Sequence, residues 1–259
     1  MGHVDGETAV AALGSGRWRA YVSPSWSISG TPNGGYSALP LLRAMGELAG
    51  QPDPVSATIH YLRPALGDAA AELTASAVRR GRRTVVVRGE LAQDGEARLV
   101  ATAVFADLAT PAGEGPELTL PAPSIPGPDA CTPRAELVQG VELALLDRVD
   151  VRVYLDATSG RAVVDGWVRF VDDTPPDPLT LVLLTDVFPP SAIAVVGPTG
   201  WVPTIELTVH VRRRPAPGWI QARFETDDLH DGRMVESGCL WDETGALVAR
   251  SRQLGLLRR

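Results

Sequence analysis

The chain has 259 residues, and its 24 basic and 31 acidic side chains give a formal net charge of −7. This acidic balance argues against a nucleic-acid-binding protein, because such proteins need basic patches to neutralise phosphates. Every basic residue is an arginine. The sequence therefore excludes mechanisms that need a Schiff-base lysine, an amine nucleophile or a phosphate-loop lysine.

Two cysteines, Cys131 and Cys239, are too few for a disulfide framework. No CxxC or His/Cys cluster has the spacing of metal ligands, so no metal or other cofactor is predicted. The first residues lack the basic and apolar regions of a secretory signal, and no apolar run approaches the roughly 18 residues that span a bilayer. We therefore expect a cytoplasmic protein with reduced thiols and no membrane span.

The clearest discontinuity in the chain is at residues 106–134, where Pro and Gly interrupt any helical or strand periodicity. We expect a linker at 108–134 between an N-terminal repeat at 1–107 and a C-terminal repeat at 135–259. On each side of the linker the same order of elements is predicted, which favours an internal duplication.

Each repeat is predicted to contain one helix followed by several strands. The first helix is PNGGYSALPLLRAMGEL, whose apolar residues have helical spacing, and the second is PPDPLTLVLLTDVFPP, which Pro residues bound at both ends. Alternating apolar runs between turn signals predict strands. The predicted strands are around 17–28, 56–64, 70–80, 83–95 and 97–107 in the first repeat, and around 149–170, 203–213, 219–229, 234–245 and 246–257 in the second.

This pattern predicts an α+β fold in which two antiparallel sheets each wrap around their own central helix. The repeats can be aligned by residue, with LPLLRAM over LVLLTDV and ARLVATAVF over ALVARSRQL. In that alignment Asp186 replaces Ala44 and Gln253 replaces Val104. The polar pair is therefore specific to the second repeat, and one site per chain is expected.

Asp186 is the most informative candidate, because on a helix it shares a face with Leu179, Val182 and Leu183. A carboxylate buried there must be hydrogen-bonded, protonated or catalytic, since burial disfavours the charged form. The alternative interpretation is a polar residue near a helix end that reaches water, with Pro189 three residues further on.

Gln253 and Thr204 are weaker candidates when taken singly. Gln253 lies in a strand with small residues on one face, where a glutamine is more often a structural hydrogen-bonding group. Thr204 begins a strand, and a β-favouring residue is common there. Strict alternation also places Thr204 on the face opposite Leu207 and Val209, unless the strand is bulged or twisted.

Several other polar groups suggest binding roles. Asn33, Gly34 and Gly35 could present backbone N–H groups to an oxyanion at a helix start, although this tripeptide is as readily a tight turn. Arg82 and Arg83, within an Arg run at 79–83, could meet the phosphates of a nucleotide-tailed substrate, although a solvated strand end is the more common interpretation. No GxSxG, P-loop or HExxH motif is present.

Four stretches resemble the double-hotdog acyl-CoA thioesterases of the bacterial type II family. They are NGGY, TIHYLRP, LLTD and the pair PTIELTVHVRRRP with ALVARSRQLGLLR, and the resemblance extends over nearly the whole chain. It implies a tandem hotdog fold, hydrolysis of acyl-CoA to free fatty acid and CoA, and a homo-oligomer, either a dimer or a dimer of dimers.

The resemblance also implies roles for three residues. Asp186, Thr204 and Gln253 match the positions that hold the hydrolytic water in that family. The chain departs from the family pattern at Glu206-Leu207 and Val209-His210, and in the Pro pair after the second helix, which leaves the acyl-chain preference open. Two alternatives remain: an enoyl-CoA hydratase-like hotdog enzyme and a non-catalytic acyl-CoA-binding protein.

Overall fold

The computed structural model describes residues 2–110, 113, 115–156 and 158–257. In these residues, 13 strands form one antiparallel sheet in the order β1-β2-β6-β7-β8-β5-β12-β15-β14-β13-β11-β10-β9, and β3 pairs with β4. No described helix is long and apolar enough to cross a membrane. The helices are α1 (His3–Glu7), α2 (Gly34–Ala49), α3 (Thr180–Leu184) and α4 (Ile193–Val196). The strands are β1 (Val10–Gly14), β2 (Arg17–Val22), β3 (Ser27–Ile28), β4 (Thr31–Pro32), β5 (Asp53–Tyr61), β6 (Ala69–Arg80), β7 (Val85–Gln93), β8 (Glu96–Ala106), β9 (Thr132–Pro133), β10 (Val149–Tyr154), β11 (Val163–Phe170), β12 (Thr204–Val211), β13 (Ile220–His230), β14 (Arg233–Trp241) and β15 (Leu247–Leu256).

Helix α2 is the long helix of the first half and confirms the helix predicted after the Asn-Gly-Gly sequence. It begins because the side-chain oxygen of Asn33 accepts a hydrogen bond from the Tyr36 N–H at 2.9 Å, which caps its first turn. It ends at Gly50, whose φ of 66° lies in the left-handed region that favours glycine. Most of its side chains are buried against β6, β7 and β8. The helix thus fills the concave side of the first half of the sheet.

The helix of the second half is much shorter than the matching helix predicted from sequence. Helix α3 has five residues, and the Asp186 N–H then bonds to the Leu183 carbonyl at 2.9 Å, three residues back instead of four. Pro189 and Pro190 follow and cannot continue a helix. Asp186 therefore lies in the turn just after α3, and not on the face of a long helix.

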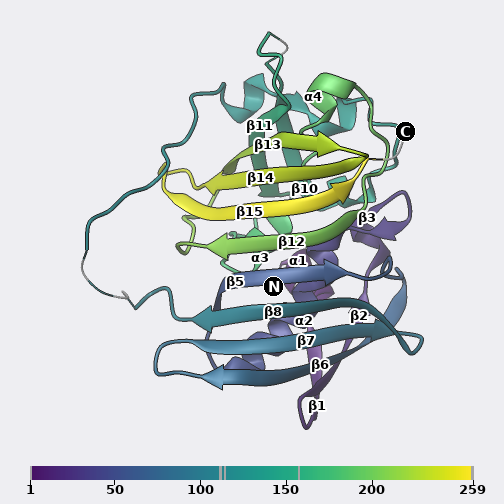
Figure 1. Cartoon of the computed structure of the whole chain (residues 1–259), viewed down its shortest axis with the longest axis vertical. Coiled ribbons are helices and arrows are strands. Elements are labelled where there is room, and N and C mark those ends of the chain that lie inside the picture. The colour runs from purple at the N-terminus through teal and green to yellow at the C-terminus, as the bar shows by residue number, and fades with distance from the viewer. Residues whose placement is uncertain (1, 111–112, 114, 157, 258–259) are drawn as a thin grey trace.

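The prediction of two separate sheets is corrected by the pairing of β5 with β12. These strands run antiparallel, and Thr58 and Thr208 face each other with their hydroxyl oxygens 2.9 Å apart. Each strand would otherwise expose a row of unpaired backbone groups at a sheet edge, and their pairing removes both edges. Figure 1 shows the result, with the blue strands of the first half continuing into the green and yellow strands of the second in front of α2 and α3.

The polypeptide between the halves crosses the outer face of the sheet. Its carbonyl groups accept hydrogen bonds from side chains of three neighbouring strands. The Nε1 of Trp241 on β14 donates to Leu120, and the Nε1 of Trp167 on β11 donates to Pro126, both at 2.8 Å. Between them Gln221 on β13 donates to the Pro123 carbonyl at 2.6 Å. This crossing segment, residues 120–126, is held against the second half of the sheet (Figure 1).

The contact between α2 and α3 leaves no room for a side chain at Gly35. A Cβ there would lie 3.0 Å from the Leu183 Cα and 3.1 Å from the Leu183 carbonyl oxygen, and backbone atoms cannot easily move. We expect Gly35→Ala to lower the free energy of unfolding by about 1–3 kcal/mol, because the two helix ends must separate. Denaturant unfolding measures the change. Gly6→Ala in α1 is the control, since a Cβ at Gly6 meets nothing within 4 Å, and an equal loss in both variants would contradict the prediction.

Candidate active site

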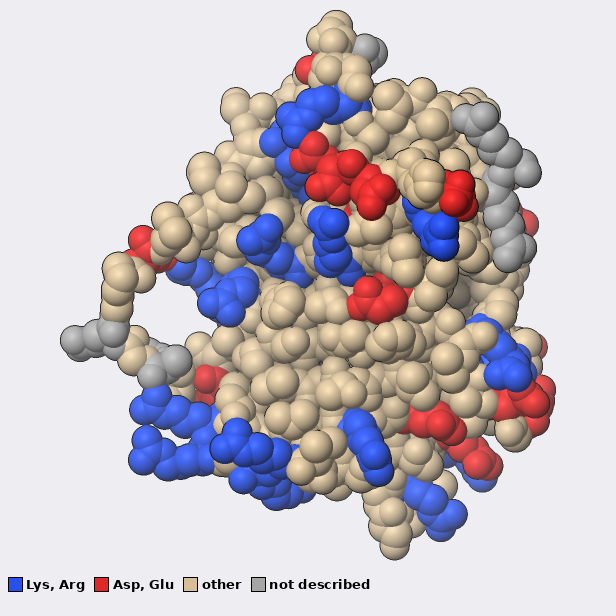
Figure 2. All heavy atoms as spheres, in the orientation of Figure 1, with Lys and Arg blue, Asp and Glu red and all other residues tan. Residues whose placement is uncertain are grey.

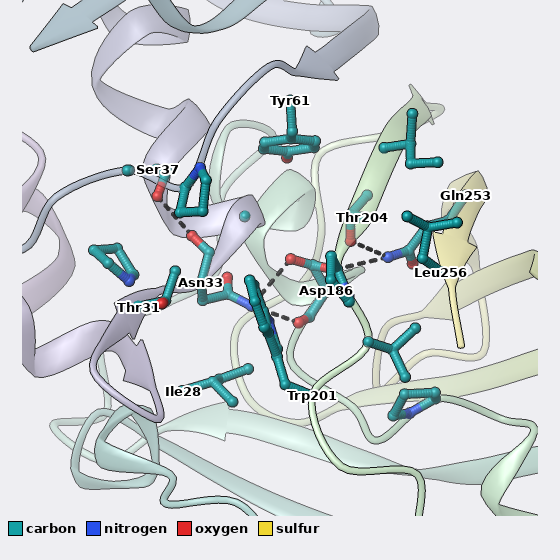
Figure 3. A pocket seen from close by; sticks show the side chains of 18 of the residues that line it. Ile28, Thr31, Asn33, Ser37, Tyr61, Asp186, Trp201, Thr204, Gln253 and Leu256 are labelled. Carbon is teal, nitrogen blue, oxygen red and sulfur yellow. Dashed lines mark hydrogen bonds between the residues drawn. The ribbon is translucent and has the colours of Figure 1, made fainter. Parts of the chain in front are cut away.

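Asp186 lies partly buried at the N-terminal end of α2, where the two halves of the chain meet. Its Oδ2 accepts hydrogen bonds from the Gly35 N–H at 2.8 Å and from the Asn33 Nδ2 at 3.0 Å. The same Asn33 amide donates to the Asp186 carbonyl oxygen at 2.7 Å. Figure 3 shows the Asn33 side chain reaching the Asp186 carboxylate from the opposite side of the pocket. The first half of the chain therefore supplies the donors that hold the carboxylate of the second half.

The other carboxylate oxygen faces the second pair of predicted residues. The Nε2 of Gln253 donates to Asp186 Oδ1 at 3.3 Å and also forms a short hydrogen bond to the Thr204 hydroxyl (Figure 3). The structure thus brings together Asp186, Thr204 and Gln253, which are far apart in sequence. Oδ2 has two donors fixed on it, whereas Oδ1 lies on the side of Gln253 and Thr204.

Thr204 reaches this position because the end of β12 is irregular. Thr204 pairs with Gly255, but Glu206 pairs with Leu254, so Ile205 is an extra residue in the ladder. A bulge of this kind reverses the alternation of side chains beyond it. Thr204 consequently points to the same face as Gln253, which strict alternation from Leu207 does not predict.

Burial has the largest effect on the pKa of Asp186. Burial raises the pKa of Asp186 from its ordinary value of 3.8 to about 6, against the opposing effects of the Gly35 N–H, the Arg134 charge and the Asn33 and Gln253 side chains. Arg134 is itself buried, and burial lowers its pKa to about 10, so it remains charged at neutral pH. Its guanidinium donates to the Val187 carbonyl and so fixes the turn that carries Asp186.

A pocket of about 370 Å³ opens beside these residues. Figure 3 shows side chains of both halves around it, with Ile28 and Asn33 at the left, Gln253 and Leu256 at the right, and Trp201 between them. Part of its wall is apolar. The side chains in that part include Phe188, Pro190, Val202, Phe224, Met234 and Leu256. No three His, Cys, Asp or Glu side chains within the described ranges are grouped as a metal site would require.

Tyr61 lines this pocket (Figure 3), and its hydroxyl is buried with no hydrogen-bond partner among the described residues. A Cβ built on Gly34 would lie 3.2 Å from the Tyr61 hydroxyl and 3.0 Å from Asp186 Oδ2. Burial, together with the charge of Asp186, raises the pKa of Tyr61 well above its ordinary value, so the phenol keeps its proton. Tyr61 therefore places an unused hydrogen-bond donor close to the carboxylate.

The two predicted phosphate-binding arginines lie elsewhere. Arg82 and Arg83 are in the turn between β6 and β7 and do not line the pocket. Arg80, at the end of β6, donates to the carbonyls of Leu48 and Ala49, which are at the C-terminal end of α2. Asn33 and Asp186 are at the other end of this 16-residue helix. The structure therefore separates these arginines from the Asp186 group by about the length of α2. A phosphate-binding role for them remains a prediction.

Three residues at the pocket were not predicted from sequence: Tyr61, Arg134 and Glu236. The burial of Glu236 could have been predicted from sequence, because Glu236 alternates with Met234, Gly238 and Leu240 on one strand face, which is buried. Tyr61 shares a face with Ile59 and reads as an ordinary β-strand aromatic residue. Arg134 follows the Pro-rich segment, where no periodicity indicates which side chains are buried.

Comparison with protein families identifies the chain. Residues 22–106 match the N-terminal domain of acyl-CoA thioesterases, and residues 116–257 match the C-terminal domain of the same proteins. The chain belongs to the acyl-CoA thioesterase family. The prediction of family made from sequence is thereby confirmed. The second match begins at residue 116, within the Pro-rich segment.

Solved structures agree with this assignment. A candidate thioesterase II from Thermobifida fusca YX is 31% identical, covers 100% of this chain and 98% of its own, and superposes with a TM-score of 0.88. A hot dog-fold protein of Alicyclobacillus acidocaldarius is 22% identical over 100% and 99% of the two chains, with a TM-score of 0.85. The acyl-CoA thioesterase II TesB2 of Mycobacterium marinum is 19% identical over 98% of each chain, with a TM-score of 0.75. The fold is therefore a hotdog fold.

An uncharacterised protein of Mycobacterium tuberculosis is 34% identical to this chain over 113 residues. That match covers 42% of this chain, and it spans only 38% of the length of the relative.

The raised pKa of Asp186 has a consequence for stability that does not depend on any substrate. A carboxyl whose folded pKa is about 6 and whose ordinary value is 3.8 binds its proton more tightly in the folded state, so folding is penalised as pH rises through this interval. The penalty is on the order of 3 kcal/mol above pH 6 and disappears below about pH 4. We expect Asp186→Asn to be more stable than the wild type at pH 8 and equal to it near pH 4. Urea unfolding at both pH values measures this, and a stability difference that does not change with pH would contradict it.

Proposed function

We propose that the protein hydrolyses fatty acyl-CoA thioesters to the free acid and CoA, using one site per chain. The observation that carries the proposal is the asymmetric holding of Asp186, with Oδ2 fixed by Asn33 and Gly35 and Oδ1 facing Gln253, at the edge of a partly apolar pocket. Membership of the acyl-CoA thioesterase family supports the reaction type. The apolar part of the wall suits an acyl chain.

Asp186 acts as the general base in this proposal. Its Oδ1 takes a proton from a water molecule held by Gln253 and Thr204, and the water oxygen attacks the thioester carbonyl carbon. The tetrahedral intermediate then expels the CoA thiolate, which recovers the proton from Asp186. A thiolate is a good leaving group, so no covalent nucleophile is needed. A base with a pKa of about 6 is charged at neutral pH and still retains basicity for the transfer.

Two hydrogen-bond donors near Asp186, the Gly34 N–H and the Tyr61 hydroxyl, are assigned to the carbonyl oxygen of the thioester substrate. The first-turn N–H groups of a helix have no intrahelical partner, and in α2 that of Gly35 binds Asp186 and that of Tyr36 binds Asn33. We assign the N–H of Gly34, which lines the pocket, to the developing oxyanion. The Tyr61 hydroxyl is the second donor, because a buried hydroxyl without a partner costs about 1–3 kcal/mol, and an acceptor on the substrate would remove that cost.

The two alternative functions are less well supported by this site. A hydratase of hotdog fold needs an aspartate and a histidine close together, and no histidine is among the residues that line the described pocket. A protein that only binds acyl-CoA would not require a buried carboxylate with a raised pKa, which lowers stability above pH 6. Hydrolysis accounts for that carboxylate, because the same burial makes it a base suited to neutral pH.

Thiol release from a panel of acyl-CoA esters of different chain length tests the proposal directly. We expect release of free CoA thiol with at least one chain length, together with formation of the free acid. Loss of the enoyl absorbance of an unsaturated ester without thiol release would instead identify a hydratase. Tight binding of the esters without either reaction would identify a binding protein.

Replacing the base should abolish turnover without unfolding the protein. We expect Asp186→Asn to lower kcat/KM by about 10²–10⁴-fold, because the amide cannot accept the proton from water. In the wild type, kcat/KM should fall about tenfold for each pH unit below about pH 6, since only the charged carboxylate accepts a proton and its pKa is about 6. Activity of Asp186→Asn close to that of the wild type would exclude this base.

The Tyr61 hydroxyl should contribute to the rate more than to binding. We expect Tyr61→Phe to lower kcat by about 10²-fold with little change in KM, because the donor acts on charge that develops in the transition state. The substitution removes a hydroxyl for which the described residues provide no partner, so the melting temperature should not fall. A lowered melting temperature with unchanged kcat would show that the hydroxyl is structural.

A further inference from the structure

A second buried carboxyl group lies next to the proposed catalytic group. Glu236 on β14 is directly paired with Gln253 on β15 and with Thr226 on β13. Directly paired residues point to the same face of a sheet, so these three side chains form a polar row on the inner face. Glu236 is only 6% exposed, and it lines the same pocket as Asp186. The polar row therefore extends the site away from Asp186 by one strand.

The Glu236 side chain is held rigidly by one of its two oxygens. Its Oε2 accepts from the Ser191 N–H at 2.6 Å and from the Ser191 hydroxyl at 2.5 Å. The Ser191 hydroxyl is also 2.8 Å from the Thr226 hydroxyl, and Ser191 is completely buried. The two hydrogen bonds from Ser191 to Oε2 fix the orientation of the carboxyl group. Because Glu236 lines the pocket, Oε1 can then bind a molecule in the pocket.

The surroundings of Glu236 are those of an acyl-binding region. The pocket that Glu236 lines also has apolar side chains in its wall, among them Phe188, Phe224 and Met234, and Met234 lies two residues from Glu236 on the same strand. A carboxyl group is costly in such a wall unless it is hydrogen-bonded. A plain alkyl chain that filled this part of the pocket would cover the carboxyl and leave Oε1 without a partner. An acyl chain with a hydrogen-bonding group at the right place would satisfy it.

We propose that Glu236 is a specificity-determining residue that selects acyl chains carrying a hydroxyl group over unsubstituted alkyl chains. The proposal rests on the proposed function and names its substrate class. A hydroxyl suits the site because it both donates and accepts, and Glu236, whose pKa burial raises to about 7, presents both protonation states near neutral pH. A second carboxylate on the acyl chain would meet the charge of Asp186, and two of the donors of Arg134 already bind Val187 and Gln139.

The geometry also limits where the hydroxyl can lie along the chain. Gln253 holds the attacking water in the proposed function, so the thioester carbonyl lies beside it. Directly paired residues on neighbouring antiparallel strands have Cα atoms about 5 Å apart, and Glu236 is one such step from Gln253. The oxygen that binds Glu236 therefore belongs to one of the first few carbon atoms after the thioester.

The test compares matched substrates in variants of Glu236. The substrates are butanoyl-CoA and hexanoyl-CoA with their 3-hydroxy and 4-hydroxy derivatives, and the measured quantity is the ratio of kcat/KM for hydroxylated to plain ester. We expect this ratio to exceed about tenfold in the wild type for one hydroxyl position, because a site that hydrogen-bonds a substrate hydroxyl strongly rejects the analogue that lacks it. Glu236→Leu should lower the ratio at least about tenfold and improve turnover of the plain ester.

Two further variants keep the result interpretable. Glu236→Gln retains an oxygen that can accept from Ser191, so it should fold normally, and its ratio should lie between those of the wild type and Glu236→Leu. Ser237→Ala is the matched control, because Ser237 is on the same strand but on the opposite face, where Arg252 donates to its hydroxyl. Its ratio should equal that of the wild type.

The outcomes distinguish failure of the proposed role of Glu236 from failure of the proposed hydrolysis. Hydrolysis of all esters with a ratio that neither Glu236 variant changes would overturn the role of Glu236 and leave the hydrolase intact. Absence of thiol release from every ester would overturn the proposed function. In that case dissociation constants for the same ester pairs, measured with the wild type and Glu236→Gln, decide whether Glu236 selects a hydroxylated chain.

Discussion

The geometry of the candidate active site depends on the contact between the Asp186 carboxylate and the first turn of α2. A buried carboxylate is destabilising unless donors surround it, and here a backbone N–H and an asparagine amide are aimed at one of its oxygens. The donors come from the first half of the chain and the carboxylate from the second. Neither half therefore contains a complete site, and the relative placement of the halves determines whether the carboxylate is held.

Several local features follow from this contact. Glycine suits positions 34 and 35 because a Cβ there would lie unusually close to Asp186, Tyr61 or the backbone of Leu183. The second helix stops after five residues, which turns Asp186 toward α2 instead of along a helix face. The joining of β5 to β12 fixes the two halves edge to edge, so the donors and the carboxylate meet in a set geometry. The pocket then occupies the junction, with walls from both halves.

Much of this arrangement could be predicted from sequence, and the omissions have physical causes. The strands and α2 follow from alternation and capping, which are local properties, and the duplication exposed Asp186 and Gln253 as polar replacements of Ala44 and Val104. The union of the sheets could not be predicted, because edge pairing between strands 150 residues apart leaves no local pattern. The position of Thr204 depended on one extra residue in β12, and a bulge is decided by pairing. Arg134 was missed because its burial depends on the turn after α3, a contact between distant segments.

The segment that connects the halves also limits how copies of the chain can associate. Residues 120–126 lie across the outer surface of β14, β13 and β11, and their carbonyls are bound by Trp241, Gln221 and Trp167. The outer face of these three strands is therefore covered at one end by the molecule's own backbone, whereas Figure 2 shows charged side chains of both signs exposed over the rest of the second half. Two copies that met face to face through the uncovered part of this surface would each use the same patch. Such an isologous contact closes after one pairing and cannot propagate into a stack or fibre.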